Sequence, residues 1–178
     1  LTNNKNRGKK PNAGGDATPV GGPNPRKGNK YGQIVRWIPD AEDHGSAGFT
    51  WSLFVMAGNP TVHDDVYAGS ANVTADNMFN SPDGLKFDGK YSNRGDFAGQ
   101  GNNQMLLGDT ATGKIRRFMV GPKECEITGI CWSGDHRTMF VGIQHPGEGG
   151  NSHFPGGGGN VPRSSVIAIT RDDDGAMG

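Results

Sequence analysis

The apolar residues of this chain lie mainly in short runs of seven to ten residues, and this feature limits the folds available to it. The runs are YGQIVRWIP, FTWSLFVMAG, GLKFDGKY, NQMLLGD, GKIRRFMVG, ITGICWS, RTMFVGIQ and SSVIAIT. Their length and their β-branched and aromatic content predict strands. DTATGK and SGDHR, each between two runs, predict hairpin turns. We therefore expect an all-β fold, with room for a helical turn or two only within residues 61–80.

Two long stretches contain almost no apolar residues. Residues 5–30 and 146–163 consist largely of Gly, Pro, Asn and charged residues, a composition typical of loops. The whole chain has 31 glycines and 11 prolines, and only 32% of its residues are hydrophobic, which leaves little material for a core. This composition argues against a compact, independent domain.

A weak internal repeat indicates a β-propeller. PDGLKFDGKY and ITGICWSGDHRTMFV share the order Gly, apolar residue, any residue, aromatic residue, turn and strand. Blades of four strands, each of about 40 residues, repeat in this way. We expect one blade over residues 84–121, another beginning at residue 127, and part of an earlier blade before them. These make about two and a half blades, whereas closed propellers have about four to eight. The open edges would therefore need further blades or a partner.

Charge and hydropathy exclude several classes of partner. Lys+Arg and Asp+Glu both number 18, so no net charge favours nucleic acid or an acidic membrane. The chain opens without Met or an apolar leader, and no apolar run reaches about 18 residues, so we expect neither a signal peptide nor a membrane span here. It reads as an internal piece of a longer protein.

Cys125 and Cys131 are too few for a disulfide framework, and we expect both to be small buried hydrophobic residues.

Polar residues at the strand ends make the candidate site. In a blade with alternating strand directions, the start of the first strand and the link between the second and third strands lie on the same face. That face collects Asn3, Asn4, Asp83, Asp96, Asn102, Asn103, Glu126, Gln144, His145 and Glu148. Carboxylate and amide oxygens with few imidazoles suit calcium or ferric iron. A cation cluster binds phosphate and generates a hydroxide nucleophile, so the pattern suggests metal-assisted hydrolysis.

Several of these residues also have structural interpretations, which the sequence leaves open. Asp83 within SPDG suits the turn before a strand. His145 suits hydrogen bonding within a loop. Glu126 stands at the start of an apolar strand and would need a partner if buried. The acidic run 172–174 is typical of a solvated surface, and the glycines at 156–159 lack the following Lys-Ser/Thr of a phosphate-binding loop.

Longer segments resemble a known family. GPKECEITGICWSGDHRTMFVGIQHPGE followed by PRSSVIAIT is similar to the C-terminal part of the PhoX-type alkaline phosphatases, as are LTNN, NPRKGNKYGQIVRW, SPDGLKFD and NQMLLGDTATGKIRRFMVGP. The resemblance runs in order along nearly all of residues 1–178. It implies a six-bladed propeller, hydrolysis of phosphomonoesters at alkaline pH, and a buried iron and calcium centre held by acidic side chains. It also implies phosphate scavenging after export to the periplasm or the exterior by the twin-arginine route.

The resemblance also assigns roles to individual residues. Asp83 in PDGL and Glu126 in CEITG resemble acidic metal ligands of the family, and Asp96 is a third, although GKYSNRGDFAGQ departs from the family pattern around it. Asn3 and Asn4 in LTNN, and Gln144 and His145 in IQHP, match family motifs that imply contacts with substrate.

The N-terminal half of the family has no counterpart in this sequence. That half supplies an iron-bridging cysteine, which Cys125 does not resemble, and the remaining ligands. We therefore expect hydrolysis to require the other blades or self-association of the chain. Two alternatives stay open: a noncatalytic calcium-binding or assembly module, and a calcium-dependent lactonase or esterase.

Overall fold

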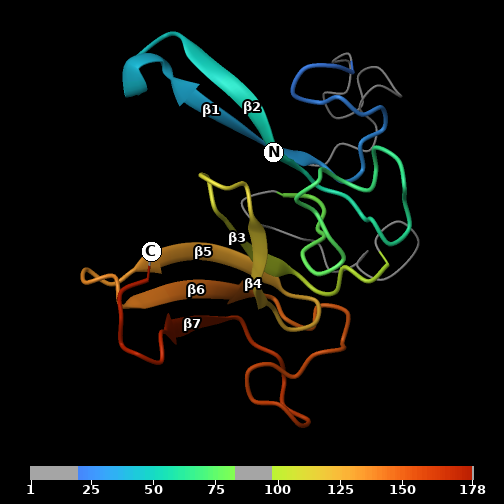
Figure 1. Cartoon of the computed structure of the whole chain (residues 1–178). Helices are drawn as coiled ribbons and strands as arrows, with labels where there is room; N and C mark the ends of the chain where they lie inside the picture. Colours follow the sequence, from blue (N-terminus) through green and yellow to red (C-terminus); the bar gives the residue numbers. More distant parts are fainter. Residues whose placement is uncertain (1–19, 83–97, 178) are drawn as a thin grey trace. The chain divides into compact units, whose positions relative to one another are not determined.

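The computed structural model describes residues 20–82 and 98–177, and within them the fold is all-β (Figure 1). The strands are β1 (Gln33–Pro39), β2 (Phe49–Met56), β3 (Gln104–Gly108), β4 (Ile115–Val120), β5 (Glu126–Trp132), β6 (Thr138–Gln144) and β7 (Ser165–Thr170). Every apolar run that falls within the described residues forms a strand, which confirms the sequence prediction; GLKFDGKY at 84–91 lies outside them.

Helical structure in the described part of the chain is limited to the 3-10 turn η1 (Asp40–Glu42). The helical turns considered possible within residues 61–80 do not form, because that segment folds as a series of turns. Residues 146–163 contain no strand, and residues 20–30 form turns closed by a bridge between Gly21 and Asn24, so the parts of the two expected loops that the structure describes are loops.

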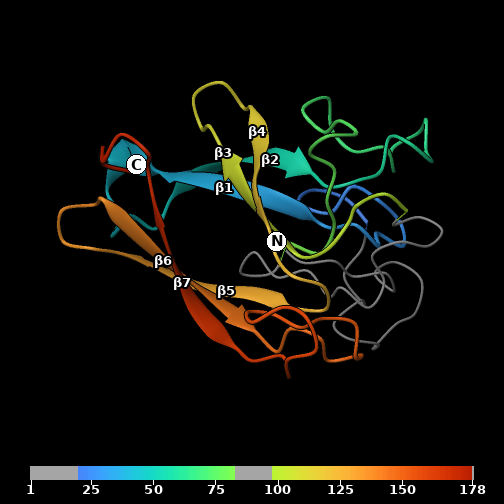
Figure 2. The same cartoon turned by 90° about the horizontal axis from the view of Figure 1, so that it is seen from below.

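The chain divides into two compact units. In the first unit, β1 and β2 pair antiparallel from Gln33 opposite Met56 to Pro39 opposite Phe49 (Figure 2). Loops beside this hairpin are held by the side chain of Arg26, which is 2% exposed. Its guanidinium donates to the carbonyls of Ala57 (2.7 Å), Gly32 (2.6 Å) and Val66 (3.1 Å). The guanidinium thus ties residues 32, 57 and 66 together through their carbonyl groups.

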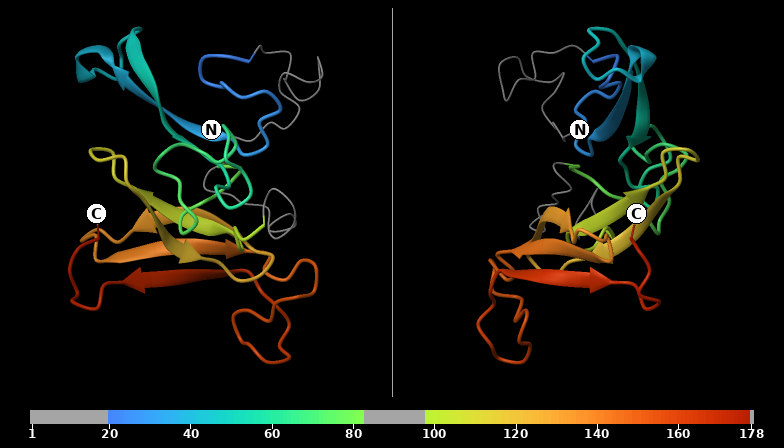
Figure 3. Two further views of the ribbon diagram at one scale, coloured as in Figure 1. Left: turned by 45° about the vertical axis from the view of Figure 1, so that its right-hand side comes forward. Right: turned by 90° about the vertical axis from the view of Figure 1, so that its left-hand side faces the viewer.

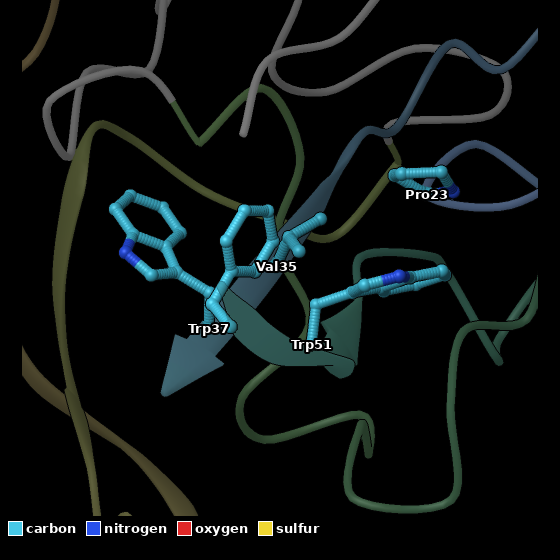
Figure 4. Close-up of a pocket in the computed structure, with 5 residues that line it drawn as sticks. Pro23, Val35, Trp37 and Trp51 are labelled. Carbon is cyan, nitrogen blue, oxygen red and sulfur yellow. The ribbon is translucent and has the colours of Figure 1, made fainter. Parts of the chain in front are cut away.

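The hairpin carries an exposed aromatic face, which we define as Trp37, Phe49 and Trp51. Trp37 and Trp51 are opposite each other in the register, so their side chains share one face of the sheet. With Pro23 and Val35 they line a hollow of about 430 Å³ (Figure 4). The three aromatic residues are 47–59% exposed, and a cluster of large exposed apolar side chains often marks a surface that packs against another element.

The second unit is built on the antiparallel sheet β5-β6-β7, with β6 in the centre (Figure 3). Alternate residues of β6 are buried, so one face of the strand packs into the core. The core cluster consists of Met105, Cys125, Ile127, Met139, Val141 and Ile143, with Phe154, Ile167 and Ile169 packed against it. A continuous meander of this kind is the arrangement expected within a propeller blade.

A β-bulge in β5 explains why Cys131 is exposed, although the sequence analysis predicts that it is buried. The register of β5 with β6 shifts between Thr128 and Ile130, around Gly129 at φ 48°. The extra residue moves every later side chain to the opposite face. Cys125 is buried as expected, but Cys131 is exposed, so the prediction that both cysteines are buried is wrong for Cys131.

No helix in the described residues is both long enough and apolar enough to span a membrane.

Candidate metal and phosphate site

The β5–β6 hairpin brings Glu126, Gln144 and His145 together. Glu126 begins β5, Gln144 ends β6, and the two are paired in the register, so their side chains project from the same face. His145 follows directly and lies between two carboxylates. Its Nε2 is 3.9 Å from Oε2 of Glu126, and its Nδ1 is 3.7 Å from Oε2 of Glu148. The side chains of Glu126, His145 and Glu148 are 18%, 39% and 77% exposed, so the site runs from a partly buried carboxylate to the surface.

The backbone at His145 turns sharply out of the strand. Its φ of 32° is in the left-handed region, which side chains other than Gly adopt at an energetic cost. The backbone N–H of His145 donates to Oγ of Ser164 at 3.0 Å, and Gly147 N donates to the carbonyl of Lys123 at 3.0 Å. The first contact ties the beginning of the loop to the residue before β7, and the second ties it to the segment before β5.

Asn102 and Asn103 support the backbone next to the site. The Oδ1 of Asn103, which is fully buried, accepts a hydrogen bond from Ile127 N at 3.1 Å. The carbonyl of Asn103 accepts from Gly121 N at 2.7 Å, and Asn102 Nδ2 donates to the carbonyl of Gly121 at 3.3 Å. The Asn103 side chain therefore positions the start of β5, which carries Glu126, while the Asn102 side chain holds the end of β4.

Cys125, the residue directly before β5, lies in the core and points away from the site. Neighbouring residues of a strand point to opposite faces, so the thiol of Cys125 enters the hydrophobic cluster while Glu126 faces the other way. Burial raises the pKa of the Cys125 thiol to about 11. The thiolate is the form that binds metals, so Cys125 is poorly suited to act as a ligand.

The described residues supply an incomplete set of metal ligands. Among them, no group of three or more His, Cys, Asp or Glu residues is arranged to hold a metal ion. Glu126 and Glu148 offer carboxylate oxygens of the kind that hard cations prefer. The other predicted site residues, Asn3, Asn4, Asp83 and Asp96, lie outside the described residues. By donor type, Glu126 and Glu148 fit part of a site for a hard cation, and calcium, iron and the individual metal and substrate roles stay predictions.

Sequence reasoning missed the residues that anchor the loop after β6. Hydrogen bonds join that loop to three residues elsewhere in the chain. The carbonyl of Lys123, the carboxylate of Glu124 and the hydroxyl of Ser164 each accept from a backbone N–H of the loop. Their partners lie 19 to 27 residues away, and no motif in the sequence marks such pairings.

The described residues thus form an all-β chain of short antiparallel sheets, consistent with part of a β-propeller, with an acidic site at the end of one hairpin. The sequence model described as Alkaline phosphatase PhoX matches residues 1–147. The chain therefore belongs to the PhoX family of alkaline phosphatases. Among the curated proteins, no significant match is found.

A solved structure shows the same relationship over more of the chain. Pseudomonas fluorescens PhoX in complex with vanadate, a transition state analogue, is 58% identical to this chain, with a TM-score of 0.88. The match covers 99% of this chain and 31% of the solved chain. The likeness confirms the fold class, a part of a PhoX-like β structure, and it shows that this chain spans less than a third of its solved relative.

Proposed function

We propose that this chain is part of a metal-dependent alkaline phosphatase that hydrolyses phosphomonoesters. The observation that carries the proposal is the 58% identity to a PhoX whose solved complex contains vanadate, a transition state analogue. The closeness of Glu126, His145 and Glu148 supports it, because these residues come from the segments that resemble the family. Phosphate scavenging, in the periplasm or outside the cell, is part of the same proposal and is tested by cell fractionation.

Within the hairpin and its following loop, the glutamates would bind the cation, and Gln144 and His145 would bind the substrate. Glu126, with its side chain 18% exposed, would hold calcium or iron through a carboxylate whose mobility the strand limits. Glu148 would contribute from the loop. The amide of Gln144 and the imidazole of His145 can donate hydrogen bonds to phosphoryl oxygens. When bound, the cations would supply positive charge that stabilises the negative charge developing on the phosphoryl group.

The test is the release of nitrophenol from nitrophenyl phosphate at alkaline pH by the longer protein that contains this chain. Glu126→Gln should reduce kcat/KM by on the order of 100-fold, because the substitution removes a charged ligand. Chelation should abolish activity, and calcium with iron should restore it. Glu42→Gln, in the exposed turn η1, is the matched control and should retain full activity. Full activity in Glu126→Gln would contradict the proposed role.

We further propose that the rest of the protein covers the aromatic face of the β1–β2 hairpin. Elements of the same unit already contact this hairpin: Arg36 Nη1 donates to the carbonyl of Thr110 at 3.0 Å, and the ring of Phe54 lies beside Gly108. The aromatic face remains exposed, and more than two thirds of the solved relative has no counterpart in this chain. Apolar blade faces in a propeller pack against neighbouring blades, so these missing parts are the fitting occupant.

Molecular mass in solution and urea unfolding test this arrangement. By mass, the longer protein should be monomeric. By urea unfolding, its Trp37→Ser variant should be less stable than the parent, because a packed interface has lost an aromatic side chain. Thr50→Ser, on the same strand as Phe49, is the control and should change little. A concentration-dependent dimer of the isolated chain that Trp37→Ser dissociates would instead identify a second copy as the occupant.

A noncatalytic calcium-binding or assembly module is the alternative function. It applies if this chain acts without the rest of the protein, because the chain covers only 31% of its solved relative. This alternative predicts that calcium raises the melting temperature of the protein and that no phosphoester is hydrolysed. The phosphatase proposal predicts that calcium raises the melting temperature and that phosphoesters are hydrolysed.

A further inference from the structure

The carboxylate of Glu124 is bonded to the loop that follows β6. Its Oε2 accepts from Gly149 N at 2.8 Å and from Asn151 N at 3.1 Å, and its Oε1 accepts from Asn151 Nδ2 at 2.5 Å. One residue earlier, the carbonyl of Lys123 accepts from Gly147 N at 3.0 Å. Glu148 therefore lies between two residues whose backbone amides are both bonded to the segment 123–124.

These bonds are of a strong type. A carboxylate that accepts from backbone amides forms charge-assisted hydrogen bonds, roughly twice as strong as neutral ones.

The local backbone is shaped for this contact. A Cβ on Gly149 would lie 2.7 Å from Oε1 of Glu124, so only glycine lets the carboxylate approach this closely. Glu124 itself has φ 58°, a left-handed conformation that is costly for a glutamate and is kept only where the surrounding structure compensates.

The contact links the two acidic residues of the site. Glu126 is two residues after Glu124, and both Glu126 and Glu148 approach His145, at 3.9 and 3.7 Å. The side chain of Glu148 is 77% exposed, so packing does little to fix it. The anchored backbone on either side of Glu148 is what defines its place.

We propose that Glu124 is a positioning residue that holds the loop 147–151 so that Glu148 faces His145 and Glu126. This inference rests on the proposed function only in taking Glu148 as part of a cation site. Glu124 does not touch the cation or the substrate: it acts through Glu148.

A double-mutant cycle on the longer protein tests this role, with calcium itself as the probe. Calorimetric titration is made for the parent, Glu124→Gln, Glu148→Gln and the double variant. Glu124→Gln should weaken calcium binding severalfold. The Nε2 group of the glutamine is a donor, and it would stand where a carboxylate oxygen accepts hydrogen bonds from the loop. The double variant should bind calcium no more weakly than Glu148→Gln alone, since residues that act in one path are not additive. Additive losses would overturn the proposal, as would a parent that binds no calcium.

Hydrogen exchange provides a second readout that does not depend on activity. The backbone amides of Gly149 and Asn151 should exchange faster in Glu124→Gln, while the amides of β6 keep their protection. Unchanged exchange at these two positions would also overturn the proposal. Glu42→Gln is the matched control, because Glu42 also has a positive φ, 56°, and lies in the other unit.

The outcomes separate this inference from the proposed function. A protein that shows the non-additive calcium cycle but no phosphatase activity retains the positioning role and loses the phosphatase assignment. An active phosphatase with additive calcium losses retains the function and loses the positioning role.

Discussion

At the scale of the residue, burial gives the two cysteines different chemistry. Cys125, directly before β5, is 2% exposed within the core cluster, whereas Cys131, within β5, is exposed. Burial raises the pKa of the Cys125 thiol to about 11, so almost none of it is thiolate at pH 8.

Iodoacetamide at pH 8 should therefore modify Cys131 first and leave Cys125 intact in the folded protein. Mass spectrometry of peptides after timed alkylation measures the two rates. In urea both thiols should react at similar rates, which is the control for intrinsic reactivity. Equal rates in the folded protein would show that the core around Cys125 opens readily.

At the scale of the element, the bulge of β5 depends on a glycine in the neighbouring strand. A Cβ on Gly142 would lie 2.8 Å from Oγ1 and 2.9 Å from the carbonyl oxygen of Thr128. Gly142→Ala should destabilise the protein by about 1–3 kcal/mol, because the bulge must shift to admit a methyl group. Urea unfolding measures the change.

Gly159→Ala is the matched control for this substitution. A Cβ on Gly159 meets nothing within 4 Å, and its φ is not in the left-handed range, so alanine should be neutral or slightly stabilising there. Equal losses for the two variants would rule out a steric cause at Gly142.

The turn between β5 and β6 should make stability depend on pH. The Asp135 carboxylate accepts from Ser133 Oγ at 2.7 Å and from Arg137 N at 3.1 Å, and these bonds lower the pKa of its carboxyl. A lowered pKa contributes stability above the unfolded-state value of about 3.9, and this contribution is lost as the pH falls through the folded-state pKa. The parent should be more stable than Asp135→Asn at pH 7, and the difference should vanish near pH 2. Urea unfolding at a series of pH values measures it; a constant difference would contradict the assignment.

At the scale of the whole molecule, the exposed tryptophans report on what surrounds the chain. Trp37, Trp51 and Trp132 are 59%, 47% and 43% exposed in this chain. In a Trp132→Phe background, acrylamide should quench the fluorescence of the isolated chain strongly and that of the longer protein weakly, because further blades would cover Trp37 and Trp51. Equally strong quenching in both would show that the aromatic face stays open.

Local sequence patterns were sufficient for most of the strands. The alternation of Met139, Val141 and Ile143 predicts a strand with one buried face, and SGDHR predicts the turn before it, because both depend on neighbours in the chain. The convergence of Glu126, Gln144 and His145 was also predictable, since a hairpin necessarily brings the start of its first strand beside the end of its second. Family likeness, rather than pattern, suggested what these residues do.

The sequence by itself determined the all-β fold, the hairpins and the meeting of Glu126 with His145, because each follows from contacts between neighbours along the chain or across a tight turn. Only the tertiary structure decided the exposure of Cys131, since the bulge at Gly129 reverses the alternation that a regular strand would keep. It alone also revealed the contact of Glu124 with Gly149 and Asn151, 25 and 27 residues away. Such contacts depend on how a loop folds back in space, and that path is set by the summed packing of the unit rather than by any local pattern.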